Sequence, residues 1–187
     1  MRLVVGLCGA TGVIYGIRFL QVLSKTRDVE THLIVSEAAM RTLEAETPWS
    51  LSQVKALASY AYDNQDIGAG ISSGSFKTEG MVVIPCSIKT MSSIANSYNY
   101  NLMTRAADVV LKEGRKLVLV IRETPLHLGH LRTMVSLAER GAVILPPMPA
   151  FYHHPETIED IVDQTVGKVL DQFQIEHNCF QRWAGTA

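Results

Sequence analysis

The sequence lacks the features of several protein classes. No apolar run approaches the roughly 18 residues that a membrane-spanning helix requires, and no basic and apolar leader precedes the first apolar run. The sequence also has no excess of charge of one sign, because it contains 17 basic and 18 acidic residues and its net charge is −1. Such a balance gives no general attraction to nucleic acid or to an anionic membrane. We therefore expect a cytoplasmic protein with neither nucleic acid nor membrane as a partner.

Cysteine is scarce, and metal-binding patterns are missing. The three cysteines, Cys8, Cys86 and Cys179, are odd in number and lack metal-ligand spacing, which indicates reduced thiols. Cys86 follows an apolar run and has no histidine in a motif relation to it, so we interpret it as a buried thiol in preference to a nucleophile. The six histidines include no HExxH-type pair. We expect no metal.

What the chain has instead is a regular alternation of short β-branched runs with amphipathic stretches. The 187 residues, 47% of them apolar, are enough for one sizeable core. The predicted strands are Arg2–Cys8, Val29–Val35, Met81–Pro85, Lys116–Ile121 and Ala142–Leu145. This alternation predicts a single-domain, three-layer α/β fold, Rossmann-like or flavodoxin-like, with a mainly parallel sheet covered by helices on both faces. The predicted flavoprotein domain spans residues 1–187, with a C-terminal tail from about residue 174.

Two local patterns predict helix positions. Ser50 and Gln53 have the spacing of a capping box, which favours a helix start at this point. Apolar residues from Ile158 to Phe173 recur with a period of about 3.6, which predicts a long last helix.

The turn after the first predicted strand, Gly9-Ala10-Thr11-Gly12, opens directly into a helical pattern. The glycines allow a sharp turn and a close backbone approach, and the first N–H groups of a helix favour an anion. A phosphate-bearing cofactor at this turn is therefore one interpretation. A plain strand-to-helix turn fits equally well, because the spacing is not that of the dinucleotide fingerprint.

Polar residues also follow the other predicted strands. Ser36 follows the second strand. The segment Pro85–Thr90 begins at the last residue of the third strand, Arg122–Pro125 follows the fourth, and Pro146–His154 follows the fifth. Ligands of such sheets bind beyond the carboxyl ends of the strands, so these residues should converge on one edge. Each serine or threonine could also be a simple helix cap.

One long loop, Asp63–Thr78, contains three glycines and three serines. Loops of this length in compact domains are commonly lids or binding loops. A disordered surface connection is the alternative that the sequence leaves open.

Five blocks of the sequence, GATGxxYG, PCSxxTxxxIA, RAADVxLKE, LVLVxREtP and GAVILPPxPxFYHxP, occur in this order from Gly9 to Pro155. In their order and spacing they resemble the flavin prenyltransferases of the UbiX/Pad1 type, formerly described as aromatic acid decarboxylases. The resemblance implies transfer of a dimethylallyl group from dimethylallyl monophosphate to N5 and C6 of reduced FMN. It also implies a homo-oligomer, possibly a dodecamer, with sites at subunit junctions, and a partner decarboxylase that uses the prenylated FMN.

The resemblance assigns roles to individual positions. The residues implied to hold FMN are Gly9, Ala10, Thr11, Ser36, Ser87, Ile88, Lys89, Thr90 and Arg122. The residues implied to contact the dimethylallyl phosphate are Arg105, Lys112, Glu123, Tyr152 and Lys168. Among these, Glu123, Thr11 and Lys112 are the catalytic candidates, with Glu123 expected to transfer a proton.

Three positions depart from the family pattern. Thr11 stands where serine is usual, which keeps the hydroxyl but adds a methyl group that stiffens the side chain. Lys168 stands where arginine is frequent and offers a point charge instead of a planar fork. Ile67 aligns with a position that is often tryptophan over the prenyl group. These changes could alter affinity or prenyl preference.

Helical geometry gives independent support to two of the implied cation sites. Arg105 and Lys112 are seven residues apart in a helical stretch, so they project in nearly the same direction and could grip one oxyanion. A solvated face with Asp108 paired to Lys112 is the alternative. Lys168 lies at the border of the apolar stripe of the last helix, where an ammonium needs an anionic partner or must reach solvent.

Other functions and residues remain open at this stage. An FMN-dependent aromatic acid decarboxylase that acts directly and a non-enzymatic FMN-binding module both fit the cofactor positions. A cysteine decarboxylase does not, because that family carries a PASANT-type block where this chain has PCSIKT from Pro85 to Thr90. We interpret His153 and His154 as loop and helix-start residues, and Tyr98, Tyr100 and Trp183 as core or tail residues.

Overall fold

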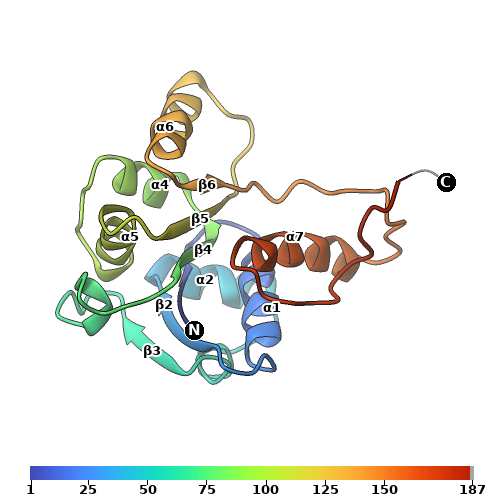
Figure 1. The fold of residues 1–187 in the computed structure, drawn as a ribbon, viewed down its shortest axis with the longest axis horizontal. Helices are drawn as coiled ribbons and strands as arrows, with labels where there is room; N and C mark the ends of the chain where they lie inside the picture. Colours follow the sequence, from blue (N-terminus) through green and yellow to red (C-terminus); the bar gives the residue numbers. More distant parts are fainter. Residues whose placement is uncertain (186–187) are drawn as a thin grey trace.

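The computed structural model describes residues 1–185, so the last two residues of the predicted domain lie outside the described part. Its centre is one six-stranded sheet in which every pair of neighbouring strands is parallel, in the order β3-β2-β1-β4-β5-β6 (Figure 1). The strands are β1 (Arg2–Leu7), β2 (Glu30–Val35), β3 (Tyr60–Asp63), β4 (Gly80–Cys86), β5 (Lys116–Ile121) and β6 (Val143–Ile144). This is the strand order of a doubly wound α/β fold, as the alternation of the sequence predicts.

Helices cover both faces of the sheet. They are α1 (Val13–Leu23), α2 (Glu37–Glu46), α3 (Leu51–Lys55), α4 (Ile88–Ala95), α5 (Leu102–Lys112), α6 (Leu128–Glu139) and α7 (Ile158–Gln172), with a 3₁₀ turn η1 (Gly70–Ser72). In Figure 1, α1 and α7 lie together on one side, and α4, α5 and α6 lie on the other. The predicted three-layer fold is therefore confirmed.

The alternation of side chains along the strands separates two cores. In β1, Leu3 and Val5 belong to the cluster under α1 and α7, whereas Val4 belongs to the cluster under α4 and α5. Successive residues of a strand point to opposite faces, so these are the two sides of one sheet. Helices α5 and α7 therefore lie on opposite faces of the sheet, so the predicted site residues on these two helices are also on opposite faces.

Most predicted elements are confirmed, with small shifts at their ends. β5 has the predicted bounds Lys116–Ile121, and the capping box at α3 is present, with Gln53 N–H donating to Ser50 Oγ over 3.2 Å. Strand β3 is missing from the prediction. It is four residues long and largely exposed at the sheet edge, so it lacks the buried apolar run that marks the other strands.

The loop from Asp63 to Thr78 is packed against α5 and is not a loose connection. Ile71 is buried, and the buried Asn64 accepts hydrogen bonds from the N–H groups of Leu102 and Met103 at the start of α5. Arg115 donates to two carbonyl oxygens of the same loop. The disordered alternative is therefore wrong.

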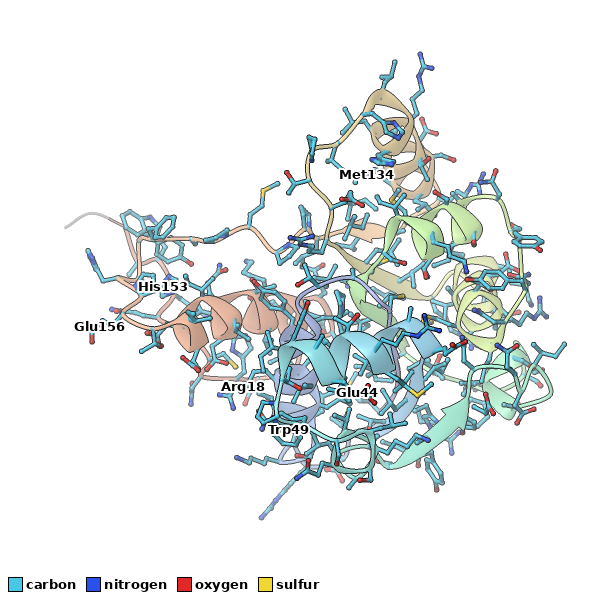
Figure 2. All side chains as sticks on the ribbon, turned by 180° about the vertical axis from the view of Figure 1, so that it is seen from behind. Arg18, Glu44, Trp49, Met134, His153 and Glu156 are labelled. Atoms are coloured by element: carbon cyan, nitrogen blue, oxygen red, sulfur yellow. The ribbon has the colours of Figure 1, made fainter. Side chains whose placement is uncertain are left out.

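A second long connection joins β6 to α7. This arm, residues 145–157, runs away from the sheet to the outer end of α7, and the tail after α7 returns to it (Figure 1). Figure 2 shows His153 and Glu156 at the outer end of the arm, away from Met134 on α6. His153 and His154 are residues of the connection, as interpreted, but they do not form the helix start, because the N-cap of α7 is Thr157. Within residues 1–185, no helix is long and apolar enough to cross a membrane.

Candidate active site

A cavity of about 430 Å³ lies where the strand order reverses, beyond the carboxyl ends of β1 and β4. It brings together five of the predicted cofactor residues: Gly9, Ser36, Ser87, Lys89 and Thr90. Its volume falls in the range of about 300–1,000 Å³ that is usual for small-molecule sites. A more open hollow of about 760 Å³ lies at the amino ends of the strands, opposite the cavity, and is lined by none of the predicted site residues. We therefore take the 430 Å³ cavity as the cofactor site.

Two helix N-termini border this cavity. Ser36 caps α2 by accepting a hydrogen bond from Ala39 N–H over 3.1 Å, and Ser87 caps α4 by accepting from Thr90 N–H over 3.3 Å. The capping role and the cavity-lining role therefore coexist in the same side chains. Helix N-termini favour anions, and Lys89 adds positive charge to the same lining, in which Arg41 is paired with Glu37. The cavity is suited to a phosphate-bearing cofactor.

The two glycines of the first turn are required for different structural reasons. A Cβ at Gly9 would lie 2.3 Å from Cβ of Ala38, so only glycine allows the turn to pass so close to α2. Gly12 has φ of 91°, in the left-handed region that favours glycine. The N–H groups of Gly12 and Val13, where a cofactor phosphate was one of two interpretations, donate to the chain's own Glu46 carboxylate over 2.8 and 3.4 Å.

A hollow of about 370 Å³ is formed next to that turn. Thr11, Tyr15, Glu46 and Arg122 line it, so two of the predicted residues meet a carboxylate and a phenol here. Burial raises the pKa of Tyr15, while the positive charge of Arg122 opposes that rise. Sequence reasoning missed Glu46, because its contact with the turn joins positions 34 residues apart and nothing in the α2 pattern signals it.

Other cavity residues were also missed. Tyr100, one of the aromatic residues that the sequence left as core or tail, lines the cavity, and the Lys89 ammonium lies 5.1 Å from the centre of its ring. The side chains of Asn64 and Asn101 also line the cavity, and both cap the start of α5. For Asn101, the available sequence signal was an asparagine, a preferred N-cap residue, directly before a helical stretch.

The two cations of α5 have partners within the chain. Arg105 Nε donates to the carbonyl oxygen of Ser72 over 3.1 Å, and its guanidinium lies 3.4 Å from the carboxylate of Asp108. Lys112 pairs with Glu113. Asp108 therefore pairs with Arg105 and not with Lys112, which was the alternative that the spacing suggested.

The remaining predicted residues lie elsewhere. Lys168 on α7 is half exposed, and its Nζ lies 3.8 Å from the Asp171 carboxylate. Tyr152 lies on the arm, where its ring meets that of Trp183 edge-on at 5.8 Å between centroids. The exposed Glu123 carboxylate accepts a hydrogen bond from Thr124 N–H, and Ile88 packs against the core beneath α4.

One chain thus brings five of the nine implied cofactor residues into one cavity, with Thr11 and Arg122 at the neighbouring hollow, whereas the residues implied for the phosphate of the donor lie apart. Arg105 and Lys112 lie on α5, and Lys168 lies on α7, on the opposite face of the sheet. Figure 1 shows this separation of α5 from α7 and the arm.

The family of the chain follows from its similarity to known proteins. Residues 1–170 match the Flavoprotein family. The chain belongs to this family. It is 60% identical over 186 residues to flavin prenyltransferase UbiX of Escherichia coli strain K12, with 98% of each chain covered, which places this flavoprotein in the flavin prenyltransferase family. The predicted resemblance is confirmed.

Solved structures of similar flavoproteins agree with this assignment. AnUbiX (PadA1), solved with FMN and dimethylallyl pyrophosphate, is 48% identical, has a TM-score of 0.97, and is matched over 100% of this flavoprotein and 98% of that chain. A dodecameric FMN-dependent UbiX-like decarboxylase of Escherichia coli O157:H7 is 54% identical, also with a TM-score of 0.97, over 99% and 100% of the two chains. FMN is the cofactor that the residues of the cavity fit.

The Cys86 thiol of this flavoprotein is unsuited to nucleophilic chemistry. Cys86 is fully buried, and its hydrogen bond with Cys8 together with burial holds its pKa well above the ordinary value. A thiol in that state is protonated at neutral pH and is a poor nucleophile. Within residues 1–185, no group of three or more His, Cys, Asp or Glu side chains is placed to hold a metal ion.

Proposed function

We propose that this chain transfers a dimethylallyl group from dimethylallyl monophosphate to N5 and C6 of reduced FMN. The observation that carries the proposal is the cavity between β1 and β4, with its two capped helix N-termini, in a chain that matches flavin prenyltransferases along nearly its whole length. The product would be prenylated FMN for a separate, partner decarboxylase. The protein would act in the cytoplasm as a single domain ending in a tail after α7.

The cofactor half of the site would hold FMN through the first turn and the starts of α2 and α4. Ser36 and Ser87 fix these two helix starts, and the nearby Lys89 favours the phosphate. Gly9 would let the turn approach the cofactor. Arg122 would add positive charge in the hollow that Thr11 also lines. Reduced FMN, when bound, supplies the electron-rich N5 and C6 atoms.

The donor half would neutralise the phosphate that leaves the dimethylallyl group. Arg105 and Lys112 would supply charge from one chain, while Tyr152 and Lys168 would supply a hydroxyl and an ammonium from another. Fixed cations that meet a developing anion stabilise the transition state, and a closed site keeps water from the allylic carbon. The opposite positions of α5 and α7 in one chain support this division.

Surface features support a homo-oligomer, for which a dodecamer is the proposed form. Helix α6 exposes Leu128, Leu131 and Val135, and the arm exposes Met148 and Phe151. Apolar groups of this size that gather on a surface are typical of contacts between proteins. A similar flavoprotein is itself a dodecamer.

Proton transfer would involve the residues around the first turn. Glu123 and Thr11 are the candidates that the family resemblance implies. Glu46 joins them, because its carboxylate lines the same hollow as Thr11 and Arg122. A carboxylate next to a hydroxyl can hold a proton that the hydroxyl relays.

The decisive experiment is anaerobic incubation of the protein with FMN, a reductant and dimethylallyl monophosphate, followed by mass spectrometry of the extracted flavin. We expect a gain of one five-carbon unit. Unchanged flavin from an FMN-loaded sample would contradict the proposal. Release of carbon dioxide from an aromatic acid with FMN alone would favour the direct decarboxylase, which is the second candidate because one similar flavoprotein carries that description.

A further inference from the structure

The Asp171 carboxylate, near the end of α7, is the centre of a charged cluster that the function described above does not use. Arg182 of the tail donates two hydrogen bonds to its two oxygens over 3.0 and 2.5 Å. His177 Nε2 lies 3.1 Å from the same carboxylate, and Lys168 Nζ lies 3.8 Å away. Three basic side chains therefore meet one carboxylate, two of them from the tail.

The protonation of His177 can be assigned from its two neighbours. The N–H group of Cys179 donates to Nδ1 of His177 over 3.2 Å, so Nδ1 must be the acceptor nitrogen. Nε2 then carries the proton and donates to Asp171. The side chain is only 1% exposed, so the ring is locked between the tail backbone and α7.

The tail also packs closely on α7. A Cβ at Gly167 would lie 2.6 Å from Cε1 of His177 and 2.5 Å from Cε1 of Phe180. Glycine at this position lets both rings lie directly on the helix. The carboxylate and the packing together fix the path of the tail.

The fixed path brings the tail to the arm. Trp183 follows Arg182 directly, and its ring meets Tyr152 at 5.8 Å between centroids with an angle of 77° between the planes. Edge-to-face pairs of this kind are favourable. The cluster around Asp171 therefore connects Lys168, the tail and Tyr152.

We propose that Asp171 is a positioning residue for the donor half of the site. It holds Arg182 and His177 so that the tail presses Trp183 against Tyr152, and it keeps the Lys168 ammonium at the same end of α7. This role rests on the proposed donor half, because Tyr152 and Lys168 are assigned there. Asp171 itself contacts neither donor nor cofactor in this account.

The test compares Asp171→Asn with a matched control on the same helix. Asp163 also forms a two-bond pair with an arginine, Arg18, over 2.5 and 2.9 Å, and the two carboxylate side chains are 19% and 21% exposed. Asp163→Asn therefore removes a comparable two-bond ion pair whose hydrogen bonds join α7 to α1 and not to the tail. Asp171→Glu keeps the charge and should restore part of any loss.

The first readout follows the tail without any catalysis. In a Trp49→Phe background, Trp183 is the remaining tryptophan, and acrylamide quenching reports its exposure. Trp183 is already 60% exposed, so we expect quenching to increase by at most about 1.7-fold in Asp171→Asn and to stay unchanged in Asp163→Asn. Equal quenching in the two variants would overturn the proposal.

The second readout separates binding of the donor from turnover. Asp171→Asn should raise KM for dimethylallyl monophosphate about tenfold, with kcat and FMN affinity within about threefold of wild type, because the lost effect is on substrate positioning. An unchanged KM despite a released tail would overturn the positioning role. If the wild-type protein makes no prenylated flavin, the proposed function fails, while the quenching comparison still decides whether Asp171 holds the tail.

Discussion

The two halves of the site differ in how the chain builds them. In the proposed FMN half, five of the nine implied residues follow neighbouring strands and line one cavity within a single chain. In the proposed donor half, the cations lie on α5 and α7, on opposite faces of the sheet. The difference implies that one chain can bind the cofactor, whereas the prenyl transfer needs more than one chain.

The largest effect is expected from breaking the assembly. Leu131→Asp with Val135→Asp places charges on the apolar face of α6, where the wild-type side chains are 46% and 57% exposed. We expect dissociation and at least a roughly 100-fold loss of prenyl transfer, because an unpaired charge is costly in an apolar contact. Analytical ultracentrifugation and product mass spectrometry measure both effects.

The control for that experiment is Arg132→Asp on the same helix, which should leave the assembly intact. FMN titration should give a Kd for the dissociated double variant within about threefold of wild type, since the cofactor half lies within one chain. A monomer with full prenyl transfer would contradict the proposal that the donor half needs residues from more than one chain.

The next effect concerns one cation of the donor half. Arg105→Gln should raise KM for dimethylallyl monophosphate by about 10- to 100-fold, because a charged hydrogen bond to phosphate is lost, and FMN affinity should not change. Steady-state kinetics and FMN titration measure the two quantities. Asp108→Asn is the matched control, since it frees the guanidinium of its 3.4 Å partner without removing it. Equal losses of FMN and donor binding would argue against separate halves.

A smaller effect is expected from the first turn. Gly9→Ala forces a Cβ to within 2.3 Å of Ala38, so the turn must move. We expect about 1–3 kcal/mol lower free energy of unfolding and weaker FMN binding. Urea unfolding and FMN titration measure these values. Gly68→Ala, where the added Cβ would be 3.4 Å from Asp66, should leave both unchanged.

Removal of single helix caps should have a still smaller effect. Ser87→Ala and Ser50→Ala each remove an N-cap, and each should lower the free energy of unfolding by about 1 kcal/mol. Only the first cap borders the cavity, so FMN affinity should fall for Ser87→Ala alone. The same affinity in both variants would mean that the α4 start does not contribute to the cofactor half.

The smallest effect is expected from pH. Hydrogen bonds from Arg182 and then from His177 hold the pKa of Asp171 below its ordinary value, with Lys168 also facing it. A carboxylate with a lowered pKa stabilises the folded state above its ordinary pKa, and that stability is lost as pH falls through the lowered value. Protonation of Asp171 should therefore not release the tail until pH falls below about 4. Titration of the carboxyl resonance of Asp171 by NMR measures this, and a midpoint well above that range would contradict it.

The sequence predicted the parts of the molecule that depend on local pattern. The apolar run of β5 and the capping box at Ser50 are in place because each depends on residues close in the sequence. The edge strand β3 was missed because its four residues bury little. Glu46 was missed because only the fold brings it to the turn at Gly12. The resemblance already implied sites at subunit junctions, but which sheet face each helix covers could be learned only from the structure.

Subunit complementation tests the central claim most directly. Two variants, Arg105→Gln and Lys168→Gln, would each be assayed alone and then co-expressed in equal amounts. If the two residues come from different chains, about a quarter of the sites in a random mixture regain both, and the mixture should recover prenyl transfer to about that fraction of wild type. A mixture no more active than the separate variants would contradict the account.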